Sequence, residues 1–220
     1  VGGPVIISAT GNIQTANINT SATSPTFAND LPVITGGNVS LQAGGNIVTG
    51  AIDSSANSDT IRADATGGQV TLRAGSNIRF ASINAQGLNP TGGTGTGGDV
   101  SITTNRGVVR GTGTIGDTNT TIGTQGTTQG GSVVIRHGGG PQNFRFVVGN
   151  SASNGTAGAI DTRSSTGNGQ VILPGQTIPN VNTLVPNNNT LTVGNPNTDG
   201  IRITFINQAP TLTANSQLTD

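Results

Sequence analysis

The sequence contains no cysteine, lysine, glutamate, methionine, tryptophan or tyrosine. Without cysteine there is no disulfide framework, which suits a reducing compartment or an exported protein that does not rely on disulfides. All nine basic residues are arginine and all nine acidic residues are aspartate. Charged residues make up 8% of the chain, against about 25% in an ordinary globular domain. Exposed helix positions depend on Glu, Lys and similar residues, whereas the abundant Gly, Thr, Asn and Ser favour turns and short strands. The composition therefore predicts an all-β protein.

Two more absences limit the partners of the chain. The formal net charge is zero, which argues against a nucleic-acid or anionic-membrane partner because both require clustered Lys and Arg. No apolar run approaches the roughly 18 residues of a membrane span. The first residue is Val1 rather than Met, as expected of a processed chain or an excised segment. We expect neither nucleic-acid binding nor a membrane span.

What the chain does contain is an internal repeat. Gly-Gly pairs open similar segments at Gly2, Gly36, Gly67, Gly97 and Gly130, with spacings of 34, 31, 30 and 33 residues. The segment GNGQVIL, residues 167–173, opens a weaker sixth unit. A period of this length indicates stacked repeat units.

Apolar residues recur at fixed places in each unit and alternate with polar residues, which is the pattern of a strand with one buried face. A second strand is expected from each Asn-Ile pair onward, with another Ile five residues after the first. The predicted core ladder comprises Val5, Ile7, Ile13, Ile18, Val39, Leu41, Ile47, Ile52, Val70, Leu72, Ile78, Ile83, Val100, Ile102, Val133, Ile135, Val171 and Leu173. In the fourth unit we place Ile115 on the column of Ile83.

Asn12, Asn46 and Asn77 precede the second strand in three successive units. Stacked asparagines can bond to each other and to the turn backbone, so we expect an inward Asn ladder. We expect the Gly-Gly pairs to turn the coil. Variable inserts, including residues 24–35, 58–66 and 88–96, fall at one place per unit and are expected to form loops on one face.

A sandwich of hairpins would also alternate, but it would not require the same residue type at the same place in every unit. The columns instead predict a right-handed parallel β-helix (solenoid) of about six or seven coils over residues 1–173. Residues 174–220 are expected to be an irregular cap or linker that ends in a strand at 201–208. Alternatively, that strand pairs with a neighbouring molecule by strand addition, through Ile201, Ile203 and Phe205.

Residues suited to catalysis or metal binding are sparse. His137 is the single histidine, and without Cys or Glu it does not complete a familiar metal site, so we expect a turn histidine. No nucleophile-elbow motif surrounds any serine. Asp53 and Asp161 share a column with Asn19 and Asn84, which indicates a polar turn ladder. Calcium-like segments at residues 92–100 and 117–121 lack the required acids. We expect no catalytic residue, no metal and no cofactor.

The repeats GGNVSLQAGGNIVTGAIDSSA, GGQVTLRAGSNIRFASINAQG and GGDVSI resemble those of filamentous-haemagglutinin-like exoproteins of Gram-negative bacteria, including the large cyanobacterial kind. The resemblance implies export by a two-partner or autotransporter route and a role in adhesion, aggregation or biofilm. It implies a non-enzymatic structural module at the cell surface or outside the cell, either a shaft segment or a fibre subunit. The partners would be further copies, end to end or lateral, neighbouring repeats of a longer chain, or a glycan or cell surface.

A polysaccharide-binding or polysaccharide-cleaving β-helix is the competing hypothesis. The inserts at residues 25–35, 88–96 and 144–156 would then form a groove. Phe144 and Phe146 would supply an exposed aromatic patch or cover the side of the solenoid. Such sites need paired carboxylates and aromatic platforms, and the chain has no Trp or Tyr and only five Phe.

Overall fold

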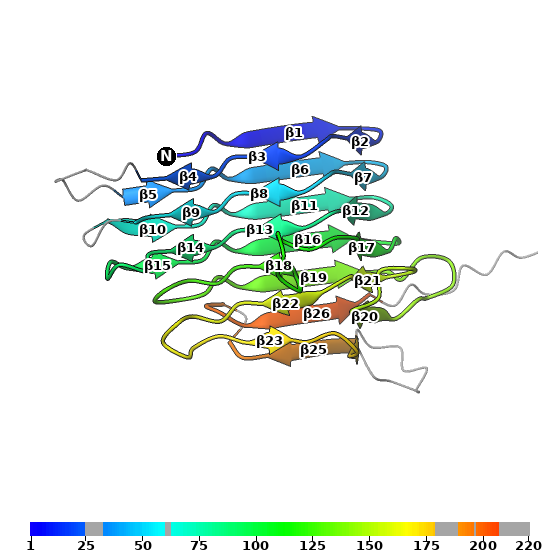
Figure 1. Cartoon of the computed structure of the whole chain (residues 1–220). Helices are drawn as coiled ribbons and strands as arrows, with labels where there is room; N and C mark the ends of the chain where they lie inside the picture. The colour runs from blue at the N-terminus through cyan, green and yellow to red at the C-terminus, as the bar shows by residue number, and fades with distance from the viewer. Residues whose placement is uncertain (25–32, 60–62, 179–188, 196, 207–220) are drawn as a thin grey trace, which may run out of the picture.

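The computed structural model describes residues 1–24, 33–59, 63–178, 189–195 and 197–206 (Figure 1). These residues form strands, turns and loops only. They contain no helix that is long and apolar enough to cross a membrane. The all-β class expected from the composition is confirmed.

The strands form five stacks that run along one axis, which we call sheets A to E. Sheet A contains β1 (Val5–Ala9), β6 (Val39–Ala43), β11 (Val70–Ala74), β16 (Val100–Thr104), β19 (Val133–His137), β26 (Ile201–Phe205) and β25 (Asn189–Val193), in that order. Sheet B contains β2 (Ile13–Gln14), β7 (Ile47–Val48), β12 (Ile78–Phe80), β17 (Val109–Gly111), β21 (Gly155–Thr156), β20 (Phe146–Val148) and β24 (Thr177–Ile178).

Sheet C contains β3 (Ile18–Asn19), β8 (Ile52–Asp53), β13 (Ile83–Asn84), β18 (Thr120–Gly123), β22 (Ala159–Asp161) and β23 (Val171–Ile172). Sheet D contains β4 (Ala22–Thr23), β9 (Ala56–Asn57) and β14 (Gly87–Leu88). Sheet E contains β5 (Val33–Thr35), β10 (Asp64–Thr66) and β15 (Gly95–Thr96). Each of the first three coils therefore passes through sheets A, B, C, D and E in turn. The second strand that the sequence suggested is two short strands, on sheets B and C, joined by a corner.

Neighbouring coils pair in parallel and in register, so like residues stack on like. Val39 pairs with Val70 and Val70 with Val100, while Leu41 pairs with Leu72. The same pairing joins the Ile columns of sheets B and C. The β-solenoid is confirmed, but it has about four turns rather than six or seven. The seven strands of sheet A, spaced by about 4.8 Å, make a stack roughly 29 Å tall.

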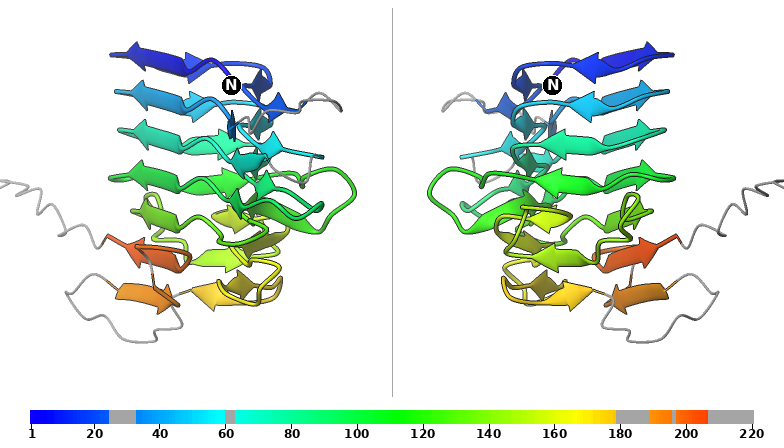
Figure 2. Two further views of the ribbon diagram at one scale, coloured as in Figure 1. Left: turned by 90° about the vertical axis from the view of Figure 1, so that its left-hand side faces the viewer. Right: turned by 90° about the vertical axis from the view of Figure 1, so that its right-hand side faces the viewer.

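The interior is divided into two compartments. The main core lies between sheets A, B and C and contains the Val, Leu and Ile columns together with Phe80 and Phe146. A small compartment between sheets D and E contains Ile34, Ala56, Ala63 and Ala65. We call the constriction between them the waist. The strands that bound the insert segments, β4 and β5, β9 and β10, and β14 and β15, lie together at one end of the coil (Figures 1 and 2).

The Gly-Gly pairs that open the units form the waist instead of turning the coil, whereas Gly44–Gly45 lies in the turn between β6 and β7, as expected. The Gly68 N–H donates to the Ser54 carbonyl at 2.7 Å, and the Ser54 hydroxyl donates back to the Gly68 carbonyl at 3.1 Å. A Cβ at Gly68 would overlap the backbone carbonyl of Gly37 in the preceding coil. At each pair the backbone therefore contacts both the opposite side of its own coil and the glycines of the neighbouring coil. Only a residue without a side chain leaves room for both contacts.

The two ends of the stack differ. At the first coil the outer edge of β1 has no partner among the described residues, and Ile6 is 75% exposed. At the last coil three sheets end in a strand that runs antiparallel to its neighbour: β25 in sheet A, β24 in sheet B and β23 in sheet C. The N-terminal end is thus an open parallel edge, and the other end is a reversed cap (Figure 2).

Several positions near the cap differ from the sequence expectation. Val171 is half-buried and Leu173 is 57% exposed, because Gly167 and Gly169, both at φ +89°, reverse the chain into a hairpin. The column of sheet A continues instead in Ile201 and Ile203, which pair with Val133 and Ile135.

The fourth and fifth units also differ. Ile122, not Ile115, pairs with Ile83, because the loop after β17 closes on itself through an Ile115–Thr120 backbone bond of 2.8 Å. The insertion at residues 141–156 leaves from the junction of sheets A and B rather than from the tip of the small compartment.

Candidate functional site

The predicted asparagine ladder exists, but it faces outward. The Oδ1 of Asn12 accepts the backbone N–H of Asn46 at 2.8 Å, and the Oδ1 of Asn46 accepts that of Asn77 at 3.0 Å. The Oδ1 of Asn77 accepts the N–H of Val108 at 3.0 Å, and the ladder ends there because the next coil has no asparagine at this position. Asn12 and Asn77 are exposed. Each amide therefore satisfies the corner of the next coil instead of packing inside the core.

The aspartates on the column of Asn19 and Asn84 are engaged in local turns. The Oδ1 of Asp53 accepts the N–H of Ser55 at 3.1 Å, and the Oδ1 of Asp161 accepts the N–H of Arg163 at 3.0 Å. Asp161 is buried and also pairs with the guanidinium of Arg163 at 2.7 Å. Such Asx turns give these carboxylates a structural role in the turn that follows each strand of sheet C. This agrees with the polar turn ladder that the shared column indicated.

His137 is not in a turn. It is the last residue of β19, and its ring is fully buried beside Phe146 and Phe205, at centroid distances of 5.6 and 5.3 Å. The Asn154 Nδ2 donates to its Nδ1 at 3.0 Å. The Nε2 is buried and has no hydrogen-bond partner within the described residues. Burial lowers the pKa of the His137 imidazole to about 4.

Asn154 fixes the tautomer of that histidine. Its Oδ1 accepts the N–H of Val109 at 2.8 Å, and its Nδ2 also donates to the carbonyl of Phe144 at 2.9 Å. The amide orientation is therefore set, Nδ1 of His137 is an acceptor, and the ring proton lies on Nε2. Nothing in the repeat pattern marks Asn154, because it lies in an insertion; its partners come from three separate segments.

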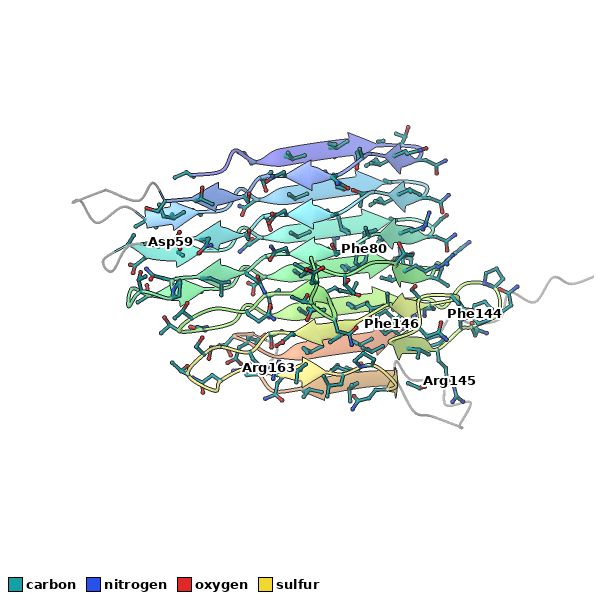
Figure 3. All side chains as sticks on the ribbon, in the orientation of Figure 1. Asp59, Phe80, Phe144, Arg145, Phe146 and Arg163 are labelled. Atoms are coloured by element: carbon teal, nitrogen blue, oxygen red, sulfur yellow. The ribbon has the colours of Figure 1, made fainter. Side chains whose placement is uncertain are left out.

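The residues of the competing polysaccharide hypothesis do not converge. Phe146 is fully buried in the main core, whereas Phe144 is 40% exposed, so the two do not form an exposed patch. Phe144 lies at the opposite side of the coil from the tip loops (Figure 3). Residues 25–32, part of the proposed groove, lie outside the described residues. Within the described ranges no group of three or more His, Cys, Asp or Glu is arranged to hold a metal ion.

The segment considered for strand addition is paired within its own chain. β26 lies between β19 and β25, so both of its edges are occupied. Ile201 and Ile203 are fully buried, and Phe205 packs against His137. The intermolecular alternative is therefore wrong for Ile201, Ile203 and Phe205, while residues 207 and 208 of the expected strand lie outside the described residues. Among the described strands, the outer edges of sheet A are β1 at one end and β25 at the other.

No family model, curated protein or solved structure matches this chain.

Proposed function

We propose that the chain is a non-enzymatic structural module, a β-solenoid shaft segment of a bacterial surface or secreted adhesin-like protein. The supporting observation is the in-register stack of parallel coils that ends in an open edge on one side and a reversed cap on the other. The outer edge of β1 in the first coil is a parallel edge of the kind that pairs with the next coil elsewhere in the stack. The likeness of the Gly-Gly repeats to those of filamentous-haemagglutinin-like exoproteins supports an extracellular location in a Gram-negative bacterium.

The cap favours a shaft over an end-to-end fibre. Stacking copies in continuous register would require a parallel edge at both ends, and β25, β24 and β23 present reversed strands. The mechanism is architectural: backbone ladders along the axis hold the coils together, and the buried columns fix the register. Four of the seven described aspartates, Asp53, Asp64, Asp99 and Asp161, accept hydrogen bonds in turns or between coils, which agrees with this role.

The first experiment extends the shaft. Duplicating residues 36–66 adds one coil between identical neighbours, and small-angle scattering should show a monomer longer by about 4.8 Å. The melting temperature should be equal or higher, because the added coil buries another copy of each column. A chain that aggregates or unfolds when one consensus coil is added would contradict a modular shaft.

The second experiment tests for carbohydrate chemistry. The purified chain is applied to a glycan array and to a reducing-sugar assay with a panel of polysaccharides. We expect no binding and no cleavage. Binding or cleavage that is lost in Asp59→Asn or Asp117→Asn variants, with unchanged melting, would replace the shaft by the polysaccharide-active alternative.

A further inference from the structure

Although the chain is neutral, its charges are separated around the coil. Of the eight arginines in the described residues, seven lie on sheets A and B or in the segments that join them: Arg73, Arg79, Arg106, Arg110, Arg136, Arg145 and Arg202. The eighth, Arg163, is paired with Asp161. Among the described residues, no aspartate lies on a strand of sheet A or B or in a segment that leads from one of these sheets to the other; Asp199 lies in the loop between β25 and β26 of sheet A.

The separation follows the long direction of the flat coil. At one end lies sheet B, with Arg79 on β12, Arg110 on β17 and Arg106 in the turn before β17. We call these three residues the basic end. At the other end lies the small compartment, where Asp59 follows β9 and Asp64 is on β10; we call these two residues the acidic end. Asp99 lies between the two ends, directly after the waist pair Gly97–Gly98 and before β16. Figure 3 shows Asp59 and Arg145 at opposite extremes of the molecule.

The two ends carry their charges at the same height along the axis. Asp64 lies on the strand that leads into β11, and Arg79 lies on the strand that follows β11. Copies placed side by side with parallel axes would therefore bring Arg79 level with Asp64.

Most of these charges are accessible, but Arg110 is half-buried and its Nε donates to the Ser151 carbonyl at 2.7 Å. Arg79, Arg106, Asp59, Asp64 and Asp99 are all exposed. Arg79 and Arg106 have no ion-pair partner within the part of the chain that the structure describes.

Asp64 and Asp99 are held in place by neighbouring coils. Asp64 accepts hydrogen bonds from the hydroxyl and N–H of Thr94, which lower the pKa of its carboxyl. Asp99 accepts the N–H of Ser132 at 2.7 Å. Both acids are thus fixed to the frame of the stack. Asp30 and Arg62, in the tip inserts, lie outside the described residues.

We propose that the basic end binds the acidic end of a second copy, so that the solenoids associate side by side into rows. An external polyanion would account for the basic end alone, whereas a second copy accounts for both ends and for their matched heights. The contact is heterologous, with different surfaces on the two partners, and therefore leaves a free basic and a free acidic end to extend the row. The proposal does not depend on the shaft function, because a row can form from any chain with these two ends.

The first test is salt dependence. In 20 mM NaCl, sedimentation and light scattering should give a weight-average mass that rises above the 21.7 kDa monomer with concentration. In 500 mM NaCl the mass should fall to that of the monomer, because the screening length shortens from about 20 Å to about 4 Å. A wild-type chain that is monomeric in both buffers would overturn the proposal.

The second test exchanges the charges. Arg79→Glu with Arg106→Glu makes both ends acidic, and Asp59→Lys with Asp64→Lys makes both ends basic. Each double variant alone should remain monomeric in 20 mM NaCl, whereas an equimolar mixture of the two should associate. Association of either variant alone at the wild-type level, or a mixture that stays monomeric, would show that these ends do not form the contact.

Controls separate position from charge and from folding. Arg136→Glu and Asp117→Lys change the charge by the same amount per substitution at exposed positions outside the two ends, and both should associate like the wild type. Circular dichroism and melting verify that every variant is folded. A monomeric wild-type chain that binds dextran sulfate in 20 mM NaCl would assign the basic end to an external anionic polymer and refute self-association.

Discussion

Acidification should destabilise the chain through one residue, His137. The imidazole is neutral and fully buried in the folded state, where its pKa is lowered from 6.5 to about 4 by loss of solvent. Protonation would also place a hydrogen on Nδ1, which accepts the Asn154 amide at 3.0 Å. Two donors would then face each other between the two phenyl rings.

The magnitude follows from the two pKa values. Above pH 6.5 the histidine is neutral in both states, so it adds no pH dependence. Between pH 6.5 and pH 4 the unfolded chain binds a proton that the folded chain does not, and the free energy of unfolding falls by about 1.4 kcal/mol per pH unit. The expected loss is about 2 kcal/mol at pH 5 and about 3 kcal/mol below pH 4.

The assay is urea unfolding at pH 7 and pH 5, followed by circular dichroism. His137 is the only histidine of the chain, so no other side chain has an ordinary pKa in this window. The matched control is His137→Gln, which keeps an acceptor for Asn154 and does not titrate. Its stability should be the same at the two pH values. An equal loss in the control, or no loss in the wild type, would refute the reasoning.

Three substitutions test the coil itself. Leu72→Ala removes a fully buried side chain from the middle of the main core and should cost about 3–5 kcal/mol of unfolding free energy, measured by urea denaturation. Gly68→Ala should reduce the melting temperature strongly, because the added Cβ overlaps the carbonyl of Gly37; Gly11→Ala, where the same atom meets open space, should leave it unchanged. Asn46→Ala removes the acceptor of one ladder bond and should cost about 1 kcal/mol. A Gly68→Ala variant as stable as Gly11→Ala would contradict the waist, and a loss below about 1 kcal/mol in Leu72→Ala would contradict a close-packed core.

The columns of the first four units could be predicted because coils that stack in register place like residues on one another. Val39, Val70 and Val100 occupy the same position in successive coils and pair with each other in sheet A. The prediction failed where a local reversal imitates a coil start. GNGQVIL has the spacing of a repeat, but the positive φ of Gly167 and Gly169 sends Val171 back along sheet C.

The replacement strand could not be found by column matching. Ile201 lies nearly 70 residues after Val133, since it follows the insertion and the hairpin, and only the tertiary structure brings the two together. The waist was missed for a different reason. The sequence of a glycine pair is the same whether the pair forms a turn or packs against the backbone of another segment. Which of these occurs depends on the residue opposite, such as Ser54, which bonds to Gly68 across the coil. The charge separation likewise becomes visible only in the folded coil, where sheet B and the small compartment lie at opposite ends.

The waist also separates the part of the coil that repeats regularly, the main core, from the part that varies between coils, the small compartment. The segments between sheets D and E span residues 24–32, 58–63 and 89–94, which differ in length and composition. The main-core strands beside them keep five residues each in strict register. Hydrogen bonds such as that between Gly68 and Ser54 close off the main core before the chain reaches the tip. The tip is therefore a natural position for grafting a foreign peptide, which every added coil would display again at intervals of about 4.8 Å.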